Sequence, residues 1–173
     1  MVSLEIIALV LTGLSITASI IYYTNVLRNA NKTQQQQIDT RQMQIFMQIY
    51  NQSHNNPNFT KAIHRILDIV NTKPIKSYEE FQKLRENEQI RESLGLVSGF
   101  YEGLGVLVRE DYVRIRPVAL LMTGMTRVWW EGVYKYWIIE GRKEMKWPRF
   151  MSEAEYLYDE LMKYVEEHPE LAT

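Results

Sequence analysis

The chain contains no cysteine among its 173 residues. This absence excludes disulfide bonds, thiolate nucleophiles and metal sites with cysteine ligands, and it agrees with a reducing compartment. A soluble part of about 125 residues does not need such cross-links, because a domain of that size buries a sufficient hydrophobic core. The sequence therefore predicts a domain held together by side-chain packing.

The chain also lacks an excess of charge of either sign, since 20 Lys and Arg residues face 21 Asp and Glu residues. There is no global attraction to nucleic acid or to anionic substrates, and we predict no nucleic-acid partner. Charge is uneven only near the end, where the segment from Ser152 to Thr173 is acidic and is expected to be solvated.

Motifs for metals and phosphate groups are missing. His54, His64 and His168 lie far apart, and no two of them place metal ligands on one helix face. No glycine-rich loop that ends in Lys-Ser or Lys-Thr is present. We therefore predict no metal and no cofactor.

One long stretch, Ile6 to Leu27, has no charged side chain. As a helix it would span about 33 Å, which is enough for a hydrocarbon core of about 30 Å. Tyr22 and Tyr23 lie near its end, where interfacial aromatic residues are common. A cleaved signal peptide and a buried soluble helix are the alternatives, but the basic segment that opens a signal peptide is missing. The stretch is typical of a transmembrane helix.

The basic residues around this stretch predict its orientation. Arg28, Lys32 and Arg41 follow it, and no Lys or Arg precedes it. The positive-inside rule then places the N-terminus outside the cell membrane and the C-terminal part in the cytoplasm. Asn-x-Ser/Thr sequences at Asn31 and two later positions would be glycosylation sites only in the opposite orientation, and we interpret them as chance matches.

The remaining chain shows helical periodicity and no sustained strand alternation. The predicted fold is all-α: one N-terminal transmembrane helix continues into a stalk, and a cytosolic bundle of about five to six helices follows. The expected boundaries are a short extracytoplasmic N-terminus (1–5), the transmembrane helix (6–27), a polar helical stalk (28–44), the helical bundle (45–167) and a tail (168–173). Capping boxes at Ser77 with Glu80 and at Ser152 with Glu155 predict two helix starts, and Pro117 is placed as a first helical residue.

The helix predicted at residues 88–109 is the most informative. Apolar residues repeat with alternating spacings of four and three from Ile90 to Val108, so this helix should be central and buried. Its remaining face carries small and polar residues, and a neighbouring helix could approach the backbone closely there: Arg91, Gly95, Ser98, Glu102, Gly105 and Arg109, with Gly99 and Gly103 alongside. Glycine costs about 1 kcal/mol relative to alanine inside a helix, which suggests that packing at these four glycines compensates.

The order of these features resembles a widespread family of uncharacterised prokaryotic membrane-anchored proteins, one of the numbered domains of unknown function. The likeness rests on the segment from Phe100 to Val108, the Trp129-Trp130 pair, Arg142, and the closing segment from Tyr156 to Leu161. The Arg114-Ile115-Arg116-Pro117 turn departs from the acidic turn of that pattern. The resemblance implies a membrane helix with a cytosolic helical bundle, and it implies no activity.

Glu102 is the candidate ionisable residue, because small residues flank it on an apolar helix and Arg127 or Arg142 could pair with it. One interpretation is a carboxylate that acts as an acid or base or anchors a ligand. The other, which we favour, is a structural ion pair between two helices. Trp129 and Trp130 could likewise line a binding surface, although aromatic residues at helical spacing more often belong to a core.

These observations favour a single-pass membrane-anchored interaction or accessory module over an enzyme, since no catalytic set is visible. The expected partners are the lipid bilayer and either another protein or a second copy of the chain. The alternative is a membrane-surface enzyme or effector that acts on a lipid or a small anion through Glu102 and an arginine.

Overall fold

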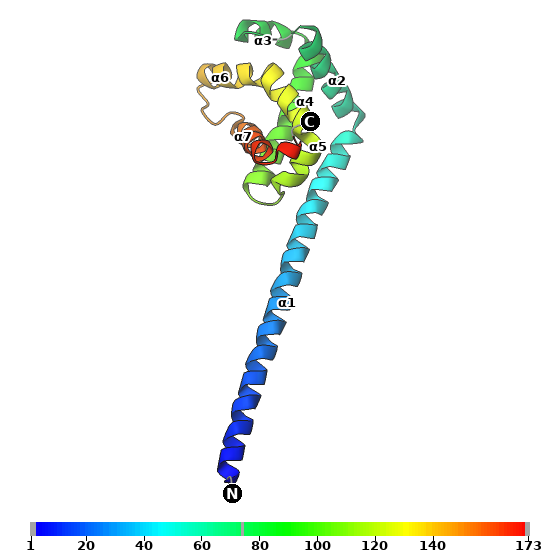
Figure 1. Cartoon of the computed structure of the whole chain (residues 1–173). Coiled ribbons are helices and arrows are strands. Elements are labelled where there is room, and N and C mark those ends of the chain that lie inside the picture. The colour runs from blue at the N-terminus through cyan, green and yellow to red at the C-terminus, as the bar shows by residue number, and fades with distance from the viewer. Residues whose placement is uncertain (1–2, 74, 172–173) are drawn as a thin grey trace. The chain divides into compact units, whose positions relative to one another are not determined.

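The computed structural model describes residues 3–73 and 75–171, and its regular elements there are all helices (Figure 1). They are α1 (Leu4–His54), α2 (Pro57–Thr72), α3 (Tyr78–Arg85), α4 (Glu88–Arg109), α5 (Ile115–Trp129), the π-helix η1 (Trp130–Tyr134), α6 (Lys135–Glu144), α7 (Ser152–Glu167) and the 3₁₀-helix η2 (Pro169–Leu171). No strand occurs in this described part, so the predicted all-α class is confirmed.

The chain divides into two compact units, one ending at Arg41 and the other beginning at Gln42. In the first unit every described side chain up to Ile38 is exposed. Within α1, an 18-residue window with a mean hydropathy of 2.1 has no buried share. Among the described residues, α1 is thus the one helix long and apolar enough to cross a membrane, a test that signal sequences also pass.

The helix starts of the second unit follow from local side-chain chemistry. Asn56 caps α2 by accepting hydrogen bonds from two backbone N–H groups, and Pro57 then opens the helix. Ser77 caps α3 as predicted, since its hydroxyl accepts the N–H of Glu80 at 3.3 Å. The Glu80 carboxylate completes the arrangement one residue earlier than a standard capping box, accepting the N–H of Lys76 at 2.8 Å.

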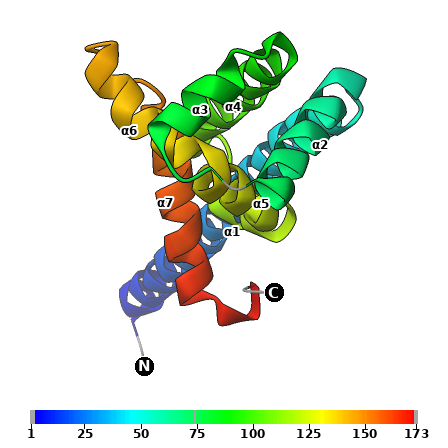
Figure 2. The same ribbon diagram turned by 90° about the horizontal axis from the view of Figure 1, so that it is seen from above.

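Helix α4 is central to the bundle, as its apolar spacing predicts, and it contacts α2, α3 and α7. Its buried residues include Leu94, Val97, Tyr101 and Leu104. Helix α3 lies beside α6 in both views (Figures 1 and 2) and contacts it. The core therefore forms around α4, with α7 and α2 packed against different sides of it.

The predicted single helix after Pro117 is interrupted by a π-helical turn. The chain runs from α5 through η1 into α6, and the start lies at Ile115, two residues before Pro117. At Gly132 in η1, an added Cβ would lie 2.6 Å from a methyl group of Val70. A larger residue there would collide with α2, and the glycine permits this close contact.

The start of α7 differs from the predicted capping box at Ser152. Ser152 is the first helical residue, and its hydroxyl donates to the carboxylate of Glu153 at 3.1 Å. The N-cap position belongs to Met151, whose left-handed backbone (φ 55°) and apolar side chain supply no cap hydrogen bond. The free backbone N–H groups of α7 therefore need an acceptor from another part of the chain.

Candidate functional site

Glu102 supplies that acceptor from the middle of α4. One of its carboxylate oxygens accepts the N–H of Ala154 at 2.8 Å and that of Glu153 at 3.1 Å. A carboxylate at a helix N-terminus also interacts favourably with the helix dipole. Glu102 thus joins α4 to α7 through backbone hydrogen bonds.

The surroundings of Glu102 disfavour its charge on balance. Partial burial raises the pKa of the Glu102 carboxyl most, and the nearby Glu153 carboxylate adds to this increase. The hydrogen bond from Ala154 and the more distant charge of Arg142 lower the pKa, but the net direction is upward.

Neither arginine predicted to pair with Glu102 forms an ion pair with it in the described part of the chain. Arg142 Nη2 lies 2.6 Å from a Glu155 carboxylate oxygen, and Arg142 Nε donates to the carbonyl of Phe150 at 2.9 Å. Arg127 Nε instead lies 3.3 Å from Glu131 Oε1 on the helix surface. Glu102 therefore has a structural role as a helix cap, not as a member of an ion pair. Arg142 stabilises the adjacent α6–α7 loop.

An open cleft of about 500 Å³ adjoins this cap. Glu102 and Val106 of α4, with Glu110 directly after the helix, line one side, and the α6–α7 loop contributes Trp147 and Arg149. Glu153, on the same cleft, is paired with Arg109, whose Nε lies 2.5 Å from its carboxylate. Glu102 serves as a helix cap and Glu153 forms an ion pair. Glu110 is the third acidic side chain that lines the cleft.

The three glycines predicted to pack against a neighbour lie on the exposed face of α4. An added Cβ at Gly95, Gly99 or Gly103 would meet no atom within 4 Å in the described part of the chain. Packing inside the bundle therefore does not use them. The close contact within the bundle occurs at Gly105, where an added Cβ would lie 2.5 Å from the Glu153 carbonyl carbon and would overlap the carbonyl oxygen.

Trp129 and Trp130 belong to the core, with exposed fractions of 1% and 8%. Trp129 stacks on Tyr101 at a ring-centroid distance of 4.2 Å and contacts Tyr134 at 4.0 Å. Trp130 stacks on Tyr158 at 5.1 Å. Among the described residues these rings contact one another, which matches the core interpretation of the pair.

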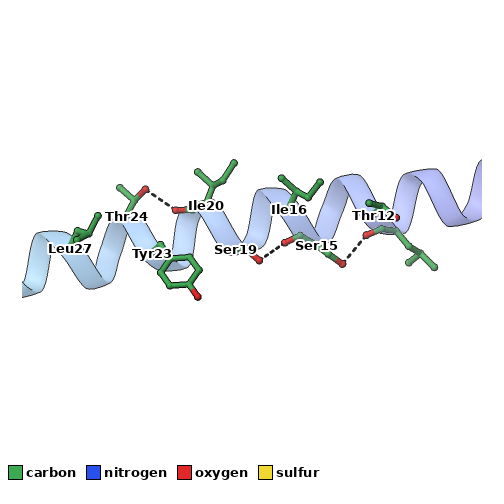
Figure 3. Close-up of a pocket in the computed structure, with 9 residues that line it drawn as sticks. Thr12, Ser15, Ile16, Ser19, Ile20, Tyr23, Thr24 and Leu27 are labelled. Carbon is green, nitrogen blue, oxygen red and sulfur yellow. Dashed lines mark hydrogen bonds between the residues drawn. The ribbon is translucent and has the colours of Figure 1, made fainter.

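A shallow groove along α1 lies on the surface of that single helix (Figure 3). Its hydroxyl groups are satisfied within the helix: Thr12, Ser15, Ser19 and Thr24 each donate to the carbonyl four residues earlier, at 2.7 to 2.9 Å. Such bonds let hydroxyl residues face a lipid environment without an unsatisfied polar group. The groove carries no charged side chain.

Comparison with known families assigns the chain to a family but indicates no activity. A family model described as a domain of unknown function, DUF4760, matches residues 4–161. The chain belongs to this family. No curated protein matches the chain, and no solved structure matches it. Membership in DUF4760 agrees with the resemblance to an uncharacterised family and, because the family has no described function, assigns no site residue.

The described residues contain no group of three His, Cys, Asp or Glu side chains that could hold a metal ion. Sequence reasoning selected Glu102 and Arg142 but missed their partners, since a backbone N–H leaves no signal in a sequence and the Arg142–Glu155 pair spans a turn. The sequence places Gly105 on the same face as Gly95 and does not distinguish it from the other glycines of α4.

Proposed function

We propose that the protein is a single-pass membrane protein whose helical bundle lies in the cytoplasm and binds a protein partner through the exposed glycine face of α4. This face is defined by Gly95, Gly99 and Gly103. The observation that carries the proposal is an apolar helix with no buried side chain in its hydrophobic window, followed by a bundle with its own core.

The membrane part of the proposal rests on the energetics of exposed apolar surface. A helix this apolar would be expected to lie in a core if it belonged to a soluble domain, but its hydrophobic window is unburied. Arg28, Lys32 and Arg41 lie on its C-terminal side, which supports a cytoplasmic bundle.

The partner part of the proposal rests on what the glycine face lacks. None of its residues has a positive φ, and none is in close contact with the bundle, so neither backbone geometry nor internal packing accounts for three helix-weakening residues. Exposed Leu96 and Val106 border the same face. A glycine stripe bordered by apolar side chains lets a partner helix approach the α4 backbone closely.

The absence of cysteine makes the topology directly testable. We would introduce one cysteine at Ser3 or one at Lys163, both exposed, and treat intact cells without a wall with a membrane-impermeant maleimide. We expect Ser3→Cys to react in intact cells and Lys163→Cys to react only after permeabilisation. The reverse pattern would refute the orientation, and loss of the Ser3 position from the mature chain would indicate a cleaved signal peptide.

The partner is tested by gentle detergent extraction of the tagged chain, followed by size determination and mass spectrometry of co-purifying proteins. We expect a stoichiometric partner or a homo-oligomer. Recovery as a monomer without a partner would count against the interaction role and would favour the alternative in which Glu102 acts on a lipid or small anion.

A further inference from the structure

A small cavity lies between α2, α4 and α5, away from the Glu102 cleft. It encloses about 290 Å³, close to the lower end of the sizes of ligand sites, about 300 Å³. Its floor consists of Phe59, Tyr101 and Met122, which are all buried. An apolar cavity of this kind is poorly hydrated, so an apolar ligand can enter it without displacing strongly held water.

The walls are apolar and adaptable. Ile63 and Leu67 of α2 and Met125 of α5 are half-buried and face the cavity. Methionine side chains are flexible and polarisable, and they adjust to ligands of different shape. Two of the lining residues are methionines, so the cavity suits a flexible aliphatic chain.

The rim is polar and lacks acidic groups. His54, Thr60 and His64 line it and are exposed, and no Asp or Glu contributes to the lining. The Nδ1 atom of His54 lies 3.0 Å from the Tyr50 carbonyl and must donate to it, so Nε2 accepts in the neutral ring and can donate to a ligand in the imidazolium form. No hydrogen bond or ion pair among the described residues occupies the His64 ring.

The frame of the cavity is held by contacts that do not involve a ligand. The Thr60 hydroxyl lies within 3.3 Å of the His54 carbonyl and 3.2 Å of the Asn56 carbonyl, and it fixes the α1–α2 turn at the rim. On the floor, Phe59 contacts the Phe100 ring at a centroid distance of 4.9 Å. The cavity is therefore preformed, which lowers the entropic cost of binding.

We propose that this cavity binds a small amphipathic carboxylate, with its apolar chain on the Phe59, Tyr101 and Met122 floor and its carboxylate at the imidazoles of His54 and His64. An imidazolium can donate to a carboxylate, whereas a rim without acids offers no opposite charge to a cationic head group. The volume limits the ligand to about ten non-hydrogen atoms, since one water-sized group occupies about 30 Å³. The proposal does not depend on membrane anchoring or on a protein partner.

The test uses the full chain in nanodiscs of zwitterionic lipid, with octanoate as the probe and ¹³C-labelled methionine methyl groups as the readout. Met122 and Met125 line the cavity, whereas Met145 and Met162 do not and serve as internal controls. We expect a saturable shift of the first two signals with octanoate. We expect octylamine to bind at least about tenfold more weakly, the difference given by one charge-assisted hydrogen bond.

Two sets of variants distinguish binding of the ligand's aliphatic chain from binding of its head group. Leu67→Phe should fill the cavity and abolish the shifts, whereas Leu121→Phe, on the exposed side of α5, should preserve them. The double variant His54→Ala/His64→Ala should keep binding of octanol and reduce the preference for octanoate over octylamine to within about twofold. The rim residues are exposed, so this variant remains informative even if Leu67→Phe does not fold.

The proposed ligand is a free carboxylate, because phosphatidylglycerol carries a phosphodiester and is far larger than the cavity. In nanodiscs with phosphatidylglycerol, methyl signals that are already shifted and do not respond to octanoate would overturn the carboxylate proposal and identify an acyl chain of the lipid as the occupant. A response to octanoate alone would identify a free carboxylate. Unshifted Met122 and Met125 signals in both nanodiscs, or an equal response to octylamine, would overturn the proposal.

Discussion

The carboxylate of Glu102 and the backbone N–H of Ala154 lie 2.8 Å apart and join the middle of α4 to the first turn of α7. Met151 cannot cap α7 because its side chain is apolar. The cap is therefore supplied by a residue 52 positions earlier in the chain. The same hydrogen bonds of Glu102 stabilise the start of α7 and the contact between α4 and α7, so a change at Glu102 affects both.

Replacing Glu102 separates the hydrogen bond from the charge. Glu102→Ala removes the cap, and we expect it to lower the free energy of unfolding by about 1 kcal/mol. Glu102→Gln keeps an oxygen that accepts the Ala154 N–H and removes the charge. Burial raises the pKa of the Glu102 carboxyl in the folded chain. The protonated carboxyl therefore contributes to the stability of the fold at low pH, and this contribution is lost as the pH rises through the raised pKa.

We therefore expect Glu102→Gln to be at least as stable as the parent chain at pH 7, with the difference vanishing at acidic pH. Thermal unfolding of the full chain in detergent, followed by circular dichroism at several pH values, measures both variants. A Glu102→Gln variant that is much less stable at neutral pH would show that the charge itself stabilises the fold. If function were lost with stability intact, the catalytic or ligand-anchoring alternative would gain support.

Glycines on α4 should respond in opposite directions to the same substitution. Gly105→Ala places a methyl group against the Glu153 backbone, and we expect a loss of about 1 to 3 kcal/mol from overpacking. Gly99→Ala meets open space and should increase stability by up to about 1 kcal/mol through helix propensity. Denaturant titration of the pair checks this, and equal effects would refute the assigned α4–α7 contact.

Buried tyrosines should make the bundle sensitive to alkali. Burial raises the pKa of Tyr101 to about 12 and that of Tyr134 still further, whereas both titrate near 10 in an unfolded chain. The contribution of the protonated hydroxyls to the stability of the folded bundle is fully present below pH 10 and decreases as the pH rises above 10. We expect Tyr101→Phe to weaken the fall in melting temperature between pH 10 and 12, and an unchanged slope would contradict its burial.

Arg142 should stabilise the α6–α7 loop through two different acceptors. Arg142→Lys cannot reproduce both the bond to the Phe150 carbonyl and the pair with Glu155, and we expect a loss of about 1 to 2 kcal/mol. Lys143→Ala removes an exposed pair with Glu140 and should cost less than about 0.5 kcal/mol. Near-ultraviolet circular dichroism reports on the loop through Trp147, and equal losses would contradict the special role of Arg142.

Much of the fold could be predicted because helices are encoded locally. The periodicity from Ile90 to Val108 and the cap at Ser77 identify α4 and α3 at the positions the structure shows. The π-helical turn at Trp130–Tyr134 could not be read in this way, because it depends on how Gly132 meets Val70 of another helix.

The sequence marked Glu102 as a candidate residue, but it did not indicate which groups the Glu102 carboxylate contacts. A carboxylate among small residues marked Glu102, whereas its acceptor role depends on the left-handed backbone of Met151, which an apolar residue does not signal. Similarly, glycine at helical spacing does not reveal that Gly105 is packed and that Gly99 is exposed. Each missed feature is a contact between segments distant in the sequence.

Photo-crosslinking in the native membrane can show whether the glycine face of α4 binds a partner. A photoreactive amino acid would replace Leu96, which is exposed at the border of the glycine face, and a matched variant would carry it at Lys163, an exposed position on α7. We expect a discrete crosslinked product from position 96 and none from position 163. No product from position 96, or equal products from both positions, would refute partner binding at this face.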